Sequence, residues 1–167
     1  RQRTANLDSI RIQGLQHLDD SARARLEGTF DIVLIDAPCS GLGTVRRSPM
    51  LKWRTTAQAL HRLHERQCAI IADYARYVRP GGILVYVTCS VMREENDDVV
   101  ARFLASHPAF RPDPLSPAFA ALGASAPGCG PEDFMLRLDP VHGGTDGFFI
   151  ARMRRRRAAD MDEWEAA

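Results

Sequence analysis

The pattern of apolar and polar positions predicts two strong strands. Residues 30–35 and residues 83–88 are almost uninterrupted apolar stretches, and residues 10–13 form a weaker stretch ahead of them. Continuous apolar stretches of strand length are typical of strands buried on both faces, as in parallel sheets. We therefore expect a parallel sheet in which 30–35 and 83–88 are buried strands.

Apolar residues spaced by three and four predict a helix after each of these strands. The first helix covers residues 55–78, with Thr55 or Thr56 available as its N-cap, and residues 79–82 (RPGG) end it. The second covers residues 93–106. An order of strand, helix, strand and helix predicts a doubly wound α/β fold, in which ligands bind at the carboxyl ends of the strands.

The rest of the chain predicts an irregular segment, a hairpin and a tail. Residues 108–131 contain six of the ten prolines and no periodicity, so we expect an irregular surface excursion. Residues 134–138 and 148–153 predict a terminal antiparallel hairpin. We therefore expect one domain over residues 1–153, followed by a charged tail at 154–167.

The composition is that of an ordinary soluble domain. The 167 residues are 45% apolar and 26% charged, with a formal net charge of +1, and a chain of this length buries a core without metal or disulfides. No apolar stretch approaches the roughly 20 residues needed to cross a bilayer, so we expect no membrane span. The four cysteines show no zinc-ligand spacing, so we expect no metal, and reduced thiols in the cytoplasm.

Each strong strand ends in a short polar motif that contains a cysteine. Residues 36–41 (DAPCSG) follow the first strand, and residues 88–90 (TCS) follow the second. Because the carboxyl ends of parallel strands meet at one edge of a sheet, we expect both thiols at the same ligand-binding edge. Buried cysteines are often inert small apolar residues, so this placement alone leaves a structural and a chemical role open.

Together with further motifs along the chain, this sequence resembles the Sun (Fmu) family of RNA cytosine-5 methyltransferases, which includes the eukaryotic Nop and NSUN enzymes. The further motifs are 51–53 (LKW), Gln67, 80–82 (PGG), 94–96 (EEN) and 144–149 (GTDGFF). The resemblance covers nearly the whole chain. It implies a Rossmann-like methyltransferase sheet that is mostly parallel, lacking its N-terminal portion here, and S-adenosylmethionine as the cofactor.

The resemblance also implies roles for the motif residues. Carbon 5 of cytosine is a poor nucleophile until an enzyme thiolate adds to carbon 6. The family pattern gives that addition to Cys89 and help with release to Cys39. Asp36 would face the cytosine ring and, with Pro38, border the cofactor pocket. Capping of the turn before Pro38 is the alternative role for Asp36, and the two roles can coexist.

Basic residues follow the first cysteine motif. Lys52, with Arg46 and Arg47, could grip RNA phosphates near a flipped base, and a solvated basic loop is the alternative. Trp53 could stack on a base, although packing is the more common role of tryptophan.

The expected function is methylation of RNA, with ribosomal RNA as the substrate class and a cytoplasmic monomer as the enzyme. Transfer RNA is an alternative substrate. An RNA-binding module that has lost catalysis is a different class of function, and a thiol redox domain is a third, disfavoured because no resolving cysteine lies close in sequence. The family's glycine-rich cofactor loop is expected upstream of Arg1, and residues 14–16 (GLQ) stand where the family has an aspartate.

Overall fold

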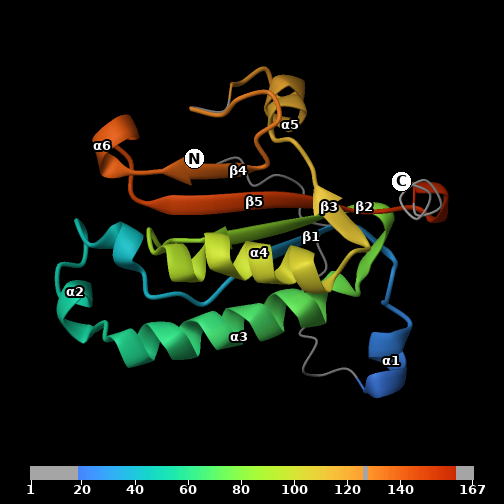
Figure 1. The fold of residues 1–167 in the computed structure, drawn as a ribbon, viewed down its shortest axis with the longest axis horizontal. Coiled ribbons are helices and arrows are strands. Elements are labelled where there is room, and N and C mark those ends of the chain that lie inside the picture. Colours follow the sequence, from blue (N-terminus) through green and yellow to red (C-terminus); the bar gives the residue numbers. More distant parts are fainter. Residues whose placement is uncertain (1–18, 126–127, 161–167) are drawn as a thin grey trace, which may run out of the picture.

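The computed structural model describes residues 19–125 and 128–160, so the strand expected at 10–13 lies outside the described part. The strands are β1 (Phe30–Asp36), β2 (Val78–Thr88), β3 (Phe110–Pro112), β4 (Met135–Leu138) and β5 (Phe148–Arg155). The helices are α1 (Asp20–Ala24), α2 (Leu51–Arg54), α3 (Ala57–Ala75), α4 (Asp97–Ser106), α5 (Ser116–Ala121) and α6 (Pro140–Gly143), with the 3-10 turns η3 (Leu42–Thr44) and η4 (Arg93–Glu95). Figure 1 shows α3 and α4 side by side along one face of the sheet.

The sheet is mixed. Its order is β1-β2-β5-β3, and β4 also pairs with β5. β1 and β2 are parallel, whereas β5 is antiparallel to β2, β3 and β4. The prediction of a mostly parallel sheet is therefore wrong for the described residues, because a continuous apolar stretch carries no information on the direction of the neighbouring strand. The terminal hairpin is confirmed, with α6 in its connection.

β1 is an edge strand with one covered face. Ile35 is 6% exposed and packs in the core with Ile71 of α3, while Ile32 and Leu34 on the other face are 59% and 65% exposed. The expectation that residues 30–35 are buried on both faces is therefore wrong in the described part of the chain. Sequence alternation is masked here because apolar residues occupy both faces.

The junction between α3 and β2 differs from the prediction. The N-cap is Thr56, whose hydroxyl accepts from the backbone N–H of Ala59. The helix ends at Ala75, and β2 already begins at Val78, so residues 79–82 lie inside the strand. A register shift of the β1–β2 pairing between Phe30 and Ile32 accommodates them.

The core lies between the sheet and the helix pair. Tyr86 of β2 and Phe149 of β5 are fully buried and meet edge to face, with ring centroids 6.4 Å apart. Val100 and Phe103 of α4 and Ile71 of α3 pack in the same cluster. This core holds the carboxyl ends of β1 and β2 on a rigid base.

The described residues of the segment 108–131 contain two regular elements, β3 and α5, each too short to show a periodic pattern in the sequence. Asp113, 7% exposed, accepts two hydrogen bonds from the guanidinium of Arg154, at 2.8 and 3.0 Å. Arg154 belongs to β5, which continues to Arg155. The expected tail at 154–167 therefore begins inside the sheet.

Candidate active site

The two motif cysteines meet at the carboxyl ends of β1 and β2. The Sγ atoms of Cys39 and Cys89 are 3.2 Å apart, and both side chains are half-buried. The pairing of the parallel strands continues one residue beyond β1, since the N–H of Ala37 donates to the carbonyl of Val87. The segments that follow the two strands emerge at the same end of the sheet, next to α2 (Figure 1). The prediction that both thiols lie at one edge is confirmed.

The surroundings of Cys39 favour its protonated form. Burial, followed by its hydrogen bond with Cys89, raises the pKa of the Cys39 thiol to about 12. A neutral thiol is therefore the stable form near pH 7, and its S–H can donate to the sulfur of Cys89. The pair can thus combine a sulfur nucleophile with an adjacent hydrogen-bond donor.

A buried carboxylate lies beneath the two cysteine loops. Glu95 is 0% exposed. It accepts hydrogen bonds from the backbone N–H and hydroxyl of Ser40, at 2.8 and 2.5 Å, and from the hydroxyl of Ser90 at 2.5 Å. Gln67 of α3 donates to the same carboxylate at 3.1 Å and to the carbonyl of Pro38 at 2.9 Å. Ser40 and Ser90 belong to the two cysteine motifs expected at this edge, whereas the sequence predicts no role for Glu95, because nothing local in 94–96 distinguishes a buried glutamate from an exposed one.

The loop around Cys89 is also held from both sides. The Thr88 hydroxyl donates to the side-chain oxygen of Asn96 at 2.6 Å, and the amide of Asn96 donates to the carbonyl of Ser90 at 3.0 Å. The hydroxyl of Tyr86 donates to the carbonyl of Glu95 at 2.8 Å. These buried bonds bind η4 and α4 to the end of β2, so the position of Cys89 is set by the core.

A glycine pair brings the 144–149 motif against the same loop. The N–H of Gly43 donates to the carbonyl of Cys89 at 3.0 Å, and the N–H of Gly147 donates to the carbonyl of Gly43 at 2.8 Å. A Cβ at Gly43 would overlap the backbone of Gly147. Glycine is therefore required for this close approach.

Asp36 and Pro38 line an open hollow of about 470 Å³ beside β1. Arg66, Ile70 and Tyr74 of α3 form its other side. The lining combines a carboxylate and a guanidinium with aliphatic and aromatic surface, which suits a ligand that carries charged groups of both signs and a flat ring.

The predicted RNA-binding residues lie in the segment after Cys39. Arg46 and Arg47 are exposed, and both face Asp146: Arg47 forms an ion pair with it, and Arg46 lies 3.9 Å away. The Nζ of Lys52 lies 5.0 Å above the ring of Trp53, which is 73% exposed. Of the two roles considered for Trp53, packing is not seen, because α2 leaves its ring on the surface of the described structure.

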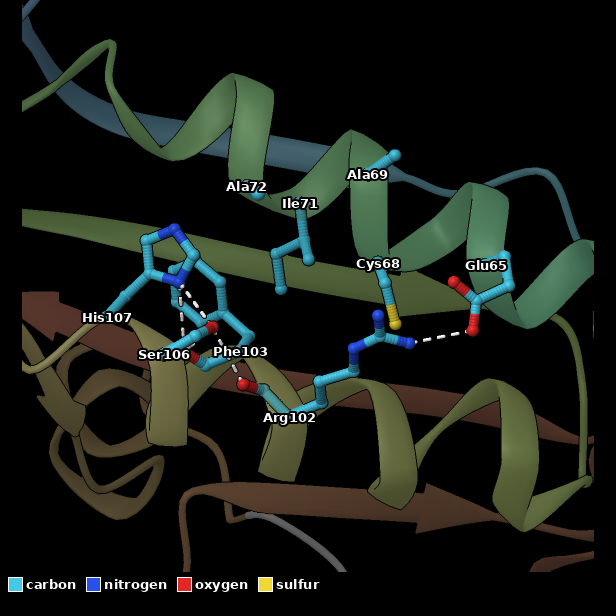
Figure 2. A pocket seen from close by; sticks show the side chains of 9 residues that line it. All are labelled: Glu65, Cys68, Ala69, Ile71, Ala72, Arg102, Phe103, Ser106 and His107. Atoms are coloured by element: carbon cyan, nitrogen blue, oxygen red, sulfur yellow. Dashed lines mark hydrogen bonds and ion pairs between the residues drawn. The ribbon is translucent and has the colours of Figure 1, made fainter.

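A second hollow, of about 340 Å³, lies between α3 and α4 and is away from the predicted residues. Figure 2 shows Cys68 facing it, with Arg102 donating to Glu65 across it at 2.7 Å. Burial raises the pKa of Cys68. The cation is neutralised by its partner, so this hollow carries no unpaired charge at Arg102.

Two absences among the described residues concern membrane helices and metal ligands. None of the helices in 19–125 and 128–160 is long and apolar enough to cross a membrane. Within the same ranges, no three His, Cys, Asp or Glu side chains gather closely enough to hold a metal ion.

The sequence matches a family model and known proteins. Residues 4–154 match the family model described as 16S rRNA methyltransferase RsmB/F. The chain is 42% identical over 127 residues to the probable ribosomal RNA small subunit methyltransferase B of Bacillus subtilis (strain 168), covering 76% of this chain and 28% of that protein. It is also 42% identical over 123 residues to ribosomal RNA small subunit methyltransferase B of Thermus thermophilus, covering 74% of this chain and 29% of that protein.

A solved structure shares the fold. The crystal structure of NSun6 from Pyrococcus horikoshii with SFG superposes with a TM-score of 0.57 at 28% sequence identity, covering 73% of this chain and 29% of that one. The chain thus spans less than a third of the length of each of these relatives.

Proposed function

This chain belongs to the RsmB/F family of 16S rRNA methyltransferases, and on that premise we propose that it carries the cysteine pair of an S-adenosylmethionine-dependent RNA cytosine-5 methyltransferase. The observation that carries the proposal is the 3.2 Å approach of the Cys39 and Cys89 sulfurs at the end of two parallel strands. Cytosine-5 methylation needs a sulfur nucleophile for addition and a second group for release.

In the proposed reaction, Cys89 is the nucleophile. Its thiolate forms a bond to carbon 6 of cytosine, and the electron pair of the 5,6 double bond makes carbon 5 nucleophilic. Bound S-adenosylmethionine would supply the electrophilic methyl group that carbon 5 takes up. Asp36, at the end of β1, would hold the protonated ring nitrogen and the amino group of the base as charge develops.

Cys39 assists the last step. Loss of the carbon 5 proton to a base restores the double bond and expels Cys89 as a thiolate. A neutral Cys39 thiol, favoured by its raised pKa, can donate a hydrogen bond to that leaving sulfur at the observed separation. This arrangement supports release of the product from the covalent adduct.

The hollow beside β1 would hold part of the cofactor. Asp36 offers a carboxylate for an ammonium group, and Pro38, Ile70 and Tyr74 offer surface for a ring. The chemical character of these residues therefore suits S-adenosylmethionine, and Asp36 would lie between the cofactor and the base.

Ribosomal RNA is the proposed substrate class. Lys52 and the exposed ring of Trp53 form a cationic and aromatic surface on α2 that could contact phosphate and base. Arg46 and Arg47 would meet RNA only by sharing or leaving Asp146. Family relatives named as small-subunit rRNA methyltransferases favour this class over transfer RNA.

Substitution of the two cysteines in the full-length protein tests the proposal. Cys89→Ala should abolish methyl transfer to small-subunit ribosomal RNA and leave the fold intact. Cys39→Ala should instead accumulate a covalent protein–RNA adduct that survives denaturation. Cys68→Ala, which alters the half-buried thiol of α3, is the matched control and should behave as wild type. Methyl transfer by the Cys89 variant would overturn the assignment, and transfer to transfer RNA alone would overturn the substrate class.

A further inference from the structure

Glu95 is a buried carboxylate that the proposed chemistry leaves without a task. Within the described residues, its partners are neutral donors only: two serines and Gln67. Burying a carboxylate costs several kcal/mol unless its hydrogen bonds are satisfied. A core that needed only stability would be served as well by an apolar side chain, so the position of these donors is informative.

The donors connect Glu95 to both cysteine loops. Ser40 directly follows Cys39, and Ser90 directly follows Cys89. The two serine hydroxyls converge on Oε2, each at 2.5 Å, and lie 3.3 Å from each other. One carboxylate oxygen therefore contacts the residue next to each sulfur.

The other oxygen anchors this assembly to the helix layer. Oε1 accepts from the backbone N–H of Ser40 at 2.8 Å and from the side-chain amide of Gln67 at 3.1 Å. These N–H donors have fixed directions, whereas the serine hydroxyls on Oε2 can rotate and act as acceptors. The position of Oε1 therefore requires a hydrogen-bond acceptor, whereas the position of Oε2 can hold either an acceptor or a donor.

We propose that Glu95 is a positioning residue that sets the distance between Cys39 and Cys89 and so governs release of the methylated base. This inference rests on the proposed function. Addition needs only the sulfur of Cys89, whereas release needs both sulfurs in contact. Loss of Glu95 removes the carboxylate link next to both sulfurs, while the hydrogen bond from Gly43 to the Cys89 carbonyl remains. The fold of the site is therefore kept but the contact between the sulfurs is loosened, so release is impaired more than addition.

The consequence is a specific kinetic signature in the full-length protein. Glu95→Ala should accumulate the denaturation-resistant protein–RNA adduct although Cys39 is present, by about tenfold over wild type, which corresponds to about 1.4 kcal/mol of lost hydrogen bonding. A merely structural role would lower addition and release together and leave no adduct.

The conservative variant Glu95→Gln should restore release. Its carbonyl oxygen can replace Oε1 and accept from the two N–H donors, while its NH₂ group replaces Oε2 and donates to hydroxyls that have rotated. Glu94→Ala is the matched control, because the neighbouring Glu94 is exposed, and it should resemble wild type. Ser90→Ala removes a single contact from the carboxylate, so it tests the same link if Glu95→Ala fails to fold, and it too should accumulate adduct.

A second measurement reports the sulfur separation without any activity. Phenylarsine oxide bridges two nearby thiols, forming two arsenic–sulfur bonds and releasing water. Wild type and Glu95→Gln should bind it through Cys39 and Cys89. Cys39→Ala should lose this binding, which identifies the two thiols. Glu95→Ala should bind it at least about tenfold more weakly.

The two proposals fail separately. Wild-type-like arsenical affinity and adduct level in both Glu95→Ala and Ser90→Ala would overturn the positioning role while the methyltransferase assignment stands. Weakened arsenical binding in Glu95→Ala, together with methyl transfer that survives Cys89→Ala, would uphold the link between the loops and overturn the proposed function.

Discussion

Gly43→Ala perturbs the contact that holds the Cys89 loop. Gly43 donates to the carbonyl of Cys89 and accepts from the N–H of Gly147, at 3.0 and 2.8 Å. A Cβ on residue 43 would lie 2.7 Å from the carbonyl carbon of Gly147 and 2.8 Å from the carbonyl oxygen of Cys89. Both are backbone atoms and cannot rotate away, so the segments must separate.

The loss in the free energy of unfolding can be estimated from the hydrogen bonds that this separation breaks. Two backbone hydrogen bonds of about 1 kcal/mol each are lost, and the reduced freedom of the unfolded chain returns roughly 0.4–1 kcal/mol. The free energy of unfolding should therefore fall by about 1–2 kcal/mol. For a cooperative unfolding unit the size of this 167-residue chain, that lowers the melting temperature of the unit by about 2–8 °C.

Thermal unfolding and single-turnover methyl transfer of the full-length protein measure the two consequences. Gly130→Ala is the control, because the nearest atom to its Cβ would be a side-chain oxygen of Asp133 at 3.4 Å, an ordinary van der Waals contact, with no backbone atom within 4 Å. The Gly43 variant should melt lower than this control and transfer methyl groups more slowly, since the Cys89 carbonyl has moved. Equal melting temperatures and equal rates in the two variants would refute the reasoning.

Two further predictions concern the pH dependence of stability and the buried ion pair. Because burial raises the pKa of Cys39 from 9.0 to about 12, the folded state keeps a proton that the unfolded state loses, and the free energy of unfolding should fall as pH rises from 9 to 12. In thermal unfolding across this range, stability should fall less steeply with pH for Cys39→Ala than for wild type. Identical slopes in the two proteins would contradict the raised pKa of Cys39. Asp113→Ala should cost about 3 kcal/mol in urea unfolding, because it removes the buried carboxylate that pairs with both Arg152 and Arg154. Asp31→Ala, which removes the exposed partner of Arg79, should cost less than about 1 kcal/mol, and equal losses would contradict the role of burial.

Local patterns in the sequence are sufficient for the elements that lead to the site. Residues 83–88, the long helix before them and the terminal hairpin each repeat their pattern over enough residues to be recognised. The meeting of Cys39 and Cys89 follows from two motifs placed after adjacent parallel strands. The same logic misses β3 and α5, which are too short to show any period.

The sequence by itself determined the longer strands and helices, the cysteine motifs and their order, because spacing along the chain reports the apolar face of an element that is long enough to show a pattern. Only the tertiary structure decided which faces are covered: Ile32 and Leu34 remain exposed on β1, and Trp53 lies on the surface. It also decided that Glu95 is buried, since its contacts with Ser40 join residues 55 positions apart. Burial and hydrogen bonding at the site depend on such long-range contacts, which no local pattern contains.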